Sequence, residues 1–365
     1  MAITTDPPRT MVPAPALLPD VLPTERLGVT GKAVPEIRAE LRRIPVARNV
    51  LAVLSVYAQS AGLIALAAWI GHPLGYLVAF VWMGRTHAAF AALSHEAAHR
   101  LLFPNKKVND WVGRWLVGYP GFISTDLYRR GHIAHHKEEF GPYEPDMNLY
   151  VGYPVSRASL RRKLTRDALG KSGWKNLRSL LRGTRAKGFG KHARRILYCQ
   201  ALFVAVCVAV GRPALYLLWF VPWMTEWRVI NRLRAIAEHG GMERSKDRRR
   251  TTHSVRQHLV ARFFLVPYNI GWHLAHHVDM GVPWRNLPRM HAELRASGWV
   301  PDGLEHRSYL ALWQALAAGQ DRPARPDPTP ISGEGGRRRS GGARRATPGR
   351  PGGSRSGRSP DRRAR

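Results

Sequence analysis

The distribution of apolar residues predicts two helical hairpins, and the first of them is the clearer. Residues 49–70 are almost all apolar. A helix of about 22 residues that rises 1.5 Å per residue can cross a hydrocarbon core of roughly 30 Å. Gly71-His72-Pro73 interrupts the pattern, and residues 74–93 form a second apolar run. We therefore expect two membrane-spanning helices joined by a tight turn.

A second hairpin is expected in the C-terminal half of the chain. Residues 196–210 and 214–227 are apolar and flank Gly211-Arg212-Pro213. Because these runs are shorter, the two spans are expected to include flanking residues and to cover about 194–211 and 213–232. The last helix is expected to continue as far as Glu238, which would place His239 near its end.

Three groups of histidines stand out among the polar positions. They read His95-Glu-Ala-Ala-His99, His132-Ile-Ala-His135-His136 and His273-Leu-Ala-His276-His277. Histidines three or four residues apart share one face of a helix, so each group can direct two or three imidazoles at one point. Neutral imidazole binds iron, zinc, copper and nickel. Eight such nitrogens exceed what one tetrahedral zinc ion takes, and they suit two metals held close together.

This pattern resembles the membrane fatty acid desaturase and hydroxylase superfamily, and within it the bacterial acyl-lipid desaturases. The resemblance covers roughly residues 45–295 and includes Glu238-His239, which looks like the family's additional histidine before the third group. About 33 residues separate the first two groups and 137 the last two, a spacing that favours the acyl desaturases. Ala275 is a departure, because many members carry Glu at this position.

The resemblance implies an all-α integral membrane protein with four transmembrane helices in two hairpins and a cytoplasmic helical cap that carries the metals. It implies two non-haem iron ions, O₂ as co-substrate, and formation of a double bond in a fatty acyl chain carried by a lipid or a thioester. Iron is preferred to zinc because cleavage of an unactivated C–H bond requires a redox metal. The implied ligands are all histidines, and those of the three groups are also the expected catalytic residues: His95, His99, His132, His135, His136, His239, His273, His276 and His277.

Other polar residues are candidates for supporting roles. Carboxylates orient metal-bound histidines by accepting the remaining imidazole N–H, and Glu96, Asp126, Glu238 and Asp279 could do so, or could be solvated or capping residues. Glu144-Pro-Asp146 is expected to form a turn, with a role behind a ligand as the alternative. Asn269 could hold a metal-bound water.

Two polar residues lie inside the second predicted span, where polar groups are costly and often functional. They are Arg85 and His87. His87 could line a substrate path or support a ligand, or it could reach towards the headgroups. Residues 111–123 contain Gly and Pro and are expected to form an interfacial or re-entrant segment. Cys199 and Cys207 fit small buried apolar positions and form no metal or redox motif.

The formal charge of +32 is unevenly distributed. Residues 322–365 contain 13 arginines among Gly, Ser and Pro, a composition typical of disorder. The charge therefore does not by itself predict a specific nucleic-acid partner, although a nucleic-acid binder that uses this tail is one alternative. The expected organisation is a flexible cytoplasmic N-terminal segment (1–45) with a short amphipathic helix over 36–48, a membrane domain (46–310), and a disordered tail (320–365).

The basic residues also predict the orientation in the membrane. Residues 100–195 are rich in Lys and Arg, whereas the two hairpin turns contain a single Arg. By the positive-inside rule, both termini and all the histidine groups face the cytoplasm, and residues 157–195 lie along anionic headgroups. The protein is therefore expected in the cytoplasmic membrane. A metal transporter is an alternative, but it would place ligands along a path through the bilayer and not at one level.

The source of electrons is expected to be a separate protein. The sequence has no Cys₄ iron–sulfur pattern, no GxGxxG fingerprint and no cytochrome b5-like segment. The resemblance implies two external electrons per turnover, so a ferredoxin-type donor with its reductase is expected. Hydroxylation or ketolation of a lipid, alkane or carotenoid remains the alternative reaction, since it also begins with removal of hydrogen from carbon.

Overall fold

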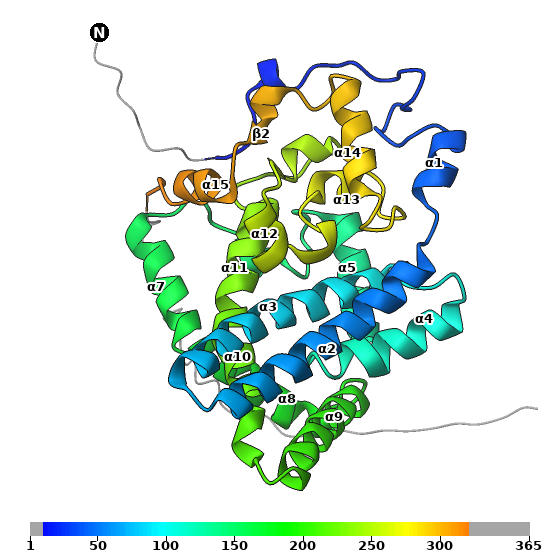
Figure 1. Cartoon of the computed structure of the whole chain (residues 1–365). Coiled ribbons are helices and arrows are strands. Elements are labelled where there is room, and N and C mark those ends of the chain that lie inside the picture. The colour runs from blue at the N-terminus through cyan, green and yellow to red at the C-terminus, as the bar shows by residue number, and fades with distance from the viewer. Residues whose placement is uncertain (1–9, 321–365) are drawn as a thin grey trace, which may run out of the picture. The chain divides into compact units, whose positions relative to one another are not determined.

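The computed structural model describes residues 10–320, and most of these residues are helical (Figure 1). The predicted disordered tail lies, from residue 321 on, outside the described residues. The α-helices are, in chain order, α1 (Pro35–Leu41), α2 (Val46–Ile70), α3 (Pro73–Ala98), α4 (Lys106–Val112), α5 (Thr125–Glu138), α6 (Met147–Tyr150), α7 (Arg157–Ala168), α8 (Lys171–Arg182), α9 (Gly190–Ala209), α10 (Leu217–Met224), α11 (Glu226–His239), α12 (Leu259–Phe264), α13 (His273–Val278), α14 (Leu287–Ala296) and α15 (Tyr309–Leu316).

Short turns and one pair of strands connect these helices. The turns are η1 (Pro15–Leu17), the π-helical η2 (Gly113–Gly118), η3 (Gly183–Arg185), η4 (Pro213–Tyr216), η5 (Arg248–Arg250), η6 (Pro267–Asn269) and η7 (Asp302–Leu304). Strands β1 (Ser254–Val255) and β2 (Glu305–His306) pair in parallel, with Ser254 opposite Glu305.

Three helical segments of the described chain are long and apolar enough to cross a membrane. They are Pro35–Ile70, which contains α2, and the helices α3 and α9. Helices α2 and α9 expose large apolar side chains such as Leu51, Trp69 and Leu202, as lipid-facing helices do. Helix α3 is instead almost wholly buried from Met83 onwards. It therefore forms the centre of the helical domain.

The fourth predicted span is not one continuous helix. The structure divides it into η4, α10 and α11, with a break at Thr225 (φ −118°, ψ −82°). Pro222 lies inside α10 and has no N–H to donate, and the hydroxyl of Thr225 bonds back to the Val221 carbonyl at 2.8 Å. Such features bend or end helices. Beyond the break, α11 does end at His239, as the sequence predicted.

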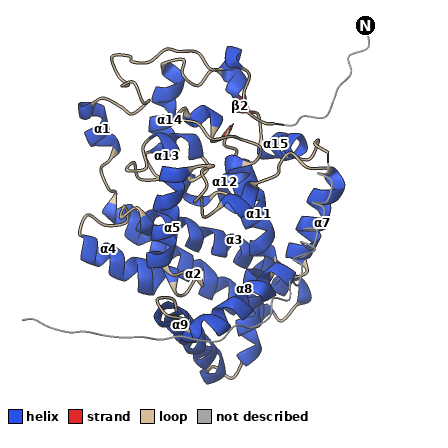
Figure 2. Ribbon diagram, turned by 180° about the vertical axis from the view of Figure 1, so that it is seen from behind, coloured by secondary structure: helices blue, strands red, loops and turns tan. Residues whose placement is uncertain are grey.

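Helix α3 lies between two groups of helices. In both views α1, α13 and α14 lie on one side of α3, and α9 lies on the other (Figures 1 and 2). Helix α2 runs beside α3 after a turn at Gly71, whose φ of 65° favours glycine. Phe90 and Leu93 of α3 share a buried cluster with Leu274 of α13 and Leu287 of α14. The C-terminal half of α3 is thereby held against the elements that carry the third histidine group.

The segment before the second histidine group packs on α3. Residues 111–123, predicted to be interfacial or re-entrant, form the end of α4, the π-helical η2 and a loop. A Cβ on Gly113 would lie 2.7 Å from the Cβ of Ala97, so glycine permits close contact with α3. The amide of Gln200 in α9 donates to the carbonyls of Tyr119 and Pro120. The loop is therefore held between α3 and α9.

The N-terminal segment is packed from residue 10 onwards. Leu27 is fully buried, and Arg26 makes two 2.7 Å bonds to Glu293 of α14. Helix α1 ends at Leu41, so it is shorter than the amphipathic helix predicted over 36–48. Pro45 accounts for this, because the residue before a proline disfavours the α conformation.

Asn49 is expected to stabilise the contact between α2 and the end of α3. Its side chain is fully buried and donates to the carbonyls of Leu101 and Leu102 at 3.2 and 3.0 Å. Asn49→Ala would leave both carbonyls without this donor, so we expect the free energy of unfolding to fall by about 1–3 kcal/mol. A thermal melt in detergent measures this loss. The exposed Ser55→Ala in the same helix is the control, and equal melting of the two variants would contradict the role of Asn49.

Candidate metal centre

The nine predicted histidines converge into two adjacent clusters. Cluster A contains five imidazoles: His95, His99, His132, His136 and His276. Cluster B contains four: His135, His239, His273 and His277. The two clusters touch, because the ring centroids of His136 and His277 are 4.3 Å apart.

Helical periodicity explains how the second and third histidine groups each contribute to both clusters. In α5, His132 and His136 are four residues apart and face cluster A, while His135 faces cluster B. In α13 the assignment is reversed, since His273 and His277 face cluster B and His276 faces cluster A. Adjacent residues differ by about 100° around a helix, so each HisHis pair directs its two rings at different clusters. Helix α3 contributes His95 and His99 to cluster A, and α11 contributes His239 to cluster B.

The spacing of the nitrogens matches metal ligands at right angles. Five pairs of Nε2 atoms lie 3.0–3.1 Å apart: His95–His276, His132–His136, His136–His276, His239–His273 and His273–His277. For a metal–nitrogen bond of about 2.1 Å, ligands at 90° are about 3.0 Å apart and tetrahedral ligands about 3.4 Å apart. The clusters therefore suit a metal with more than four ligands.

Polar groups behind cluster B fix the orientation of its rings. The Nδ1 atom of His135 is 2.9 Å from Glu144, that of His277 is 2.5 Å from Glu139, and that of His239 donates to the Thr251 carbonyl at 2.9 Å. Arg248 pairs with Glu139 at 2.6 Å. Such hydrogen bonds leave the Nε2 lone pairs pointing into the cluster.

Hydrogen bonds alone cannot pair all the Nε2 atoms of cluster B. A carbonyl only accepts, so a neutral His239 carries its proton on Nδ1 and a lone pair on Nε2, and His277 facing the Glu139 carboxylate is in the same state. Both lone pairs lie 3.1 Å from Nε2 of His273, which has at most one proton to share. A cation among these three nitrogens removes the conflict. The donor set therefore fits a bound metal.

Burial keeps most of these imidazoles neutral, which is the form that binds metals. It lowers the pKa of His99 to about 3, and it also lowers the pKa of His132, His136, His239, His273, His276 and His277. His135 differs. Burial acts to lower its pKa, but the hydrogen bond and the charge of Glu144 outweigh burial and raise it. The same pairing holds the pKa of Glu144 below its usual value, against the effect of burial.

The candidate carboxylates from the sequence have different surroundings. Glu238 is the one nearest a cluster, 3.7 Å from Nδ1 of His273. Glu96 accepts from the Trp284 backbone amide, Asp126 pairs with Arg114, and Asp279 pairs with Arg38 and Arg42. Glu144, for which a turn was the favoured interpretation, lies in a turn and also contacts His135.

The remaining polar candidates lie away from the clusters. The side chain of Asn269 accepts from Arg262 at 3.0 Å, and no described contact joins it to a histidine of either cluster. His87 is buried and donates from Nε2 to the Trp219 carbonyl, so it fastens α3 to α10 and does not reach the headgroups. Arg85 donates to the Phe263 carbonyl and to Gln59.

Sequence reasoning missed several residues around the clusters. They are Glu139, Thr251, Tyr128 and Arg234. The ring of Tyr128 stacks on His132 with 5.2 Å between centroids, and Arg234 is buried and donates to Glu238. Glu139 lies three residues after His136, the last histidine of the second group, which was an available signal. The Thr251 carbonyl has no side-chain signature at all.

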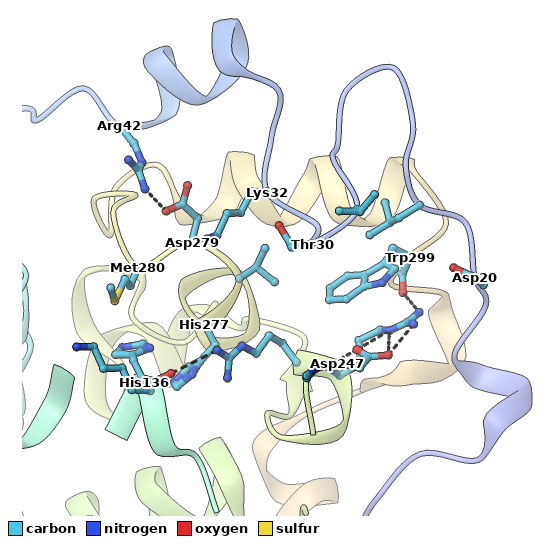
Figure 3. Close-up of a pocket in the computed structure, with 17 residues that line it drawn as sticks. Asp20, Thr30, Lys32, Arg42, His136, Asp247, His277, Asp279, Met280 and Trp299 are labelled. Atoms are coloured by element: carbon cyan, nitrogen blue, oxygen red, sulfur yellow. Dashed lines mark hydrogen bonds and ion pairs between the residues drawn. The ribbon is translucent and has the colours of Figure 1, made fainter. Parts of the chain in front are cut away.

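A polar pocket of about 530 Å³ reaches the clusters from the side of α1 and α14 (Figure 3). His136 and His277 are among its lining residues, so the pocket reaches one ring of each cluster. Its wall carries the cations Lys32, Arg42, Lys137, Lys246, Arg248 and Arg249, against the carboxylates Asp20, Asp247 and Asp279. The pocket is therefore a positively charged approach to the metal centre.

Comparisons with known proteins agree with this geometry. The chain is 25% identical over 238 residues to dihydrorhizobitoxine desaturase of Bradyrhizobium elkanii, a match that covers 60% of this chain and 66%, just under two thirds, of that protein. It is 25% identical over 253 residues to sn-1 oleoyl-lipid 12-desaturase of Arthrospira platensis, covering 61% of this chain and 68% of that protein.

A family-level match covers the whole metal centre. The sequence model of the fatty acid desaturase family matches residues 67–309, a range that includes all nine histidines. The two relatives are desaturases as well. With two converging histidine clusters on a helical scaffold, this match identifies the chain as a member of the fatty acid desaturase family, for which a histidine-ligated metal centre is expected.

Proposed function

We propose that the protein is an integral membrane enzyme that introduces a double bond into a fatty acyl chain, using O₂ and two iron ions held by the nine histidines. The observation that supports this most directly is the pair of adjacent, all-histidine clusters at the ends of α3 and α11. In the proposed reaction the acyl chain loses two hydrogens. O₂, two electrons and two protons complete the balance, and two water molecules are formed.

Iron is favoured by the chemistry of the reaction and by the donor set. Two bound irons would supply the oxidising power, drawn from O₂, that cleavage of an unactivated C–H bond needs. Zinc has no redox chemistry and prefers four ligands in a tetrahedron. The 3.0–3.1 Å spacing of the Nε2 atoms suits a higher coordination number.

The protein's own residues hold the site in one arrangement. Glu144, Glu139 and the Thr251 carbonyl keep the protons of His135, His277 and His239 on Nδ1, so that each Nε2 faces inward. Arg248 keeps Glu139 in place. The buried setting excludes water from most of the cluster, which protects an oxidising centre from side reactions.

The membrane orientation and the electron donor are part of the proposal. The positive-inside rule would place the clusters at the cytoplasmic surface of the cytoplasmic membrane. An acidic ferredoxin-type donor, reduced by its own reductase, would approach the basic pocket that ends at His136 and His277. Lys32, Lys137 and Lys246 have no ion-pair partner among the described residues, so their charge is free to attract such a donor.

Expression in a bacterial host with a ferredoxin and its reductase tests the reaction. We expect a new unsaturated acyl species by mass spectrometry and about two irons per chain. His276→Ala removes a ligand of cluster A, so it should abolish the product and lower the iron content. His72→Ala, at the α2–α3 turn, should change neither. An oxygenated product would assign the chain to the hydroxylases, and absence of both iron and product would refute the proposal.

Glu144→Gln is expected to weaken metal binding without unfolding the protein. The amide is a poorer acceptor for the Nδ1 proton of His135, and loss of such a partner lowers metal affinity by about 10–100-fold. Iron retention against a chelator measures this effect. Glu138→Gln, in the same region but facing Arg244 at 3.9 Å, is the matched control. Equal iron retention in both variants would show that Glu144 does not orient a ligand.

Charge reversal at the pocket should slow electron delivery. The exposed pair Lys137→Glu and Lys246→Glu is expected to lower the rate at limiting donor concentration by about 10-fold, because electrostatic steering of this kind changes association rates by 10-fold or more. The rate at saturating donor should be unchanged. The control is Lys106→Glu with Lys107→Glu on α4, which makes the same change in net charge. If both pairs slow the enzyme equally, the donor does not use this pocket.

A further inference from the structure

Two neighbouring pockets, distinct from the pocket of Figure 3, differ in chemistry: one is basic and the other is apolar. The first, of about 290 Å³, is basic and is lined by Arg166, Lys171, Lys175, Arg228 and Arg232, together with Asp167 and four uncharged residues. The second, of about 330 Å³, has mainly aromatic and aliphatic walls, including Phe122, Leu180, Ile196, Trp223 and Trp227. Asn176 and Arg228 line both pockets, so the two pockets adjoin each other at these side chains.

The basic pocket has cations that no carboxylate neutralises. Asp167 is engaged by Arg232 and by Ser172. Lys171 and Lys175 are exposed and form no ion pair among the described residues. Arg228 stacks on Trp223, with 4.4 Å from its guanidinium carbon to the ring centre, and its Nε donates to the Trp223 carbonyl. Three cations are thus directed at one small space, which suits a phosphate.

Close packing of α8 brings these cations together. A Cβ on Gly173 would lie 2.1 Å from the Met224 carbonyl oxygen. Glycine therefore lets α8 approach the end of α10, directly beside the break at Thr225. Lys171 and Lys175 flank Gly173 on α8, and Arg228 follows the break at the start of α11. The interruption of the fourth segment thereby contributes to the pocket.

The apolar pocket ends next to cluster A. Tyr128 is one of its lining residues, and the Tyr128 ring stacks on His132. The same ring is 6.4 Å from His95 between centroids. An alkyl chain lying in this pocket would therefore be separated from the nearest metal ligands by one aromatic ring.

We propose that these two pockets form the binding site of a membrane phospholipid, with its phosphate on Lys171, Lys175 and Arg228 and one acyl chain in the groove that ends at Tyr128. This inference rests on the proposed function and specifies its substrate as a phosphate-bearing lipid. Around the basic pocket the side chains of Leu149, Leu169, Trp174 and Leu181 are exposed. Apolar and basic side chains together are typical of a surface at the headgroup level, so the lipid enters directly from the bilayer.

A photoreactive lipid tests this site without turnover. The full-length protein, reconstituted in phosphatidylglycerol vesicles, is irradiated with phosphatidylglycerol that carries a diazirine near the middle of one acyl chain, and the labelled peptides are identified by mass spectrometry. Label is expected on the segments that contain Phe122, Tyr128, Trp223 and Trp227. Label confined to the exposed faces of α2 and α9 would overturn the proposal.

A charge-matched pair of variants tests the phosphate contacts. Lys171→Glu with Lys175→Glu should reduce labelling of the groove by about tenfold, because each basic residue contributes substantially to the binding of an anionic headgroup. Arg185→Glu with Lys187→Glu makes the same charge change in the same basic region, at exposed residues outside both pockets, and should leave groove labelling unchanged. Equal loss in both pairs would mean that general attraction to the membrane, and not this pocket, holds the lipid.

A competition arm separates the phospholipid from an acyl thioester. An excess of unlabelled long-chain acyl-coenzyme A should not displace groove labelling, and complete displacement would assign the site to a thioester and overturn the choice of phospholipid. The labelling requires neither O₂ nor an electron donor. Groove labelling in a protein that forms no unsaturated product would therefore contradict the proposed reaction while supporting the lipid site. Formation of an unsaturated product without groove labelling would support the reaction and overturn the lipid site.

Discussion

The conflict among the closely spaced imidazoles of the two clusters is the constraint on which the rest of the structure depends. Neutral histidines whose Nε2 atoms lie 3.0–3.1 Å apart present lone pairs to one another, and burial disfavours the protonated form that would relieve the conflict. Cations between the rings would remove this conflict. Metal binding would therefore be coupled to correct packing of α3, α5, α11 and α13, because the histidines of the two clusters lie on or at the ends of these four helices.

Most of the site could be predicted from the sequence, because its signals are local. The spacing of His132, His135 and His136 predicts which imidazoles share a helical face. The structure brings all nine predicted histidines together. The groups that hydrogen-bond to the outer nitrogens of these histidines have no such local signal. The contact of Glu139 with His277 joins residues 138 positions apart, and the Thr251 carbonyl is a backbone atom. Glu139 lies near the second histidine group in sequence, but neither contact follows from a periodic pattern, so the pairing of each group with its histidine could not be derived without the fold.

The same distinction between local and tertiary signals explains why three apolar runs were predicted correctly as helices and the fourth was not. The apolar runs that became α2, α3 and α9 needed only their length and hydropathy. The fourth run was predicted as one helix, because its composition is equally apolar. Its break depends on Pro222, on the bond from Thr225 to Val221, and on the close approach of α8 at Gly173. Proline was visible in the sequence, but the contact with α8 is tertiary and could not be read from it.

The two pockets approach the metal centre at different histidines. His132 and His136 are one helical turn apart on α5. Tyr128 and the apolar groove lie beside His132, whereas the positively charged pocket of Figure 3 is lined by His136. In the proposed enzyme, an alkyl chain and an electron donor would therefore reach the metals from different sides. Such a separation would keep the alkyl chain in a dry groove while electrons and protons arrive from water. The alternating assignment of the HisHis pairs in α5 and α13 agrees with it, because each helix contributes histidines to both clusters and would hold the proposed metals between the two approaches.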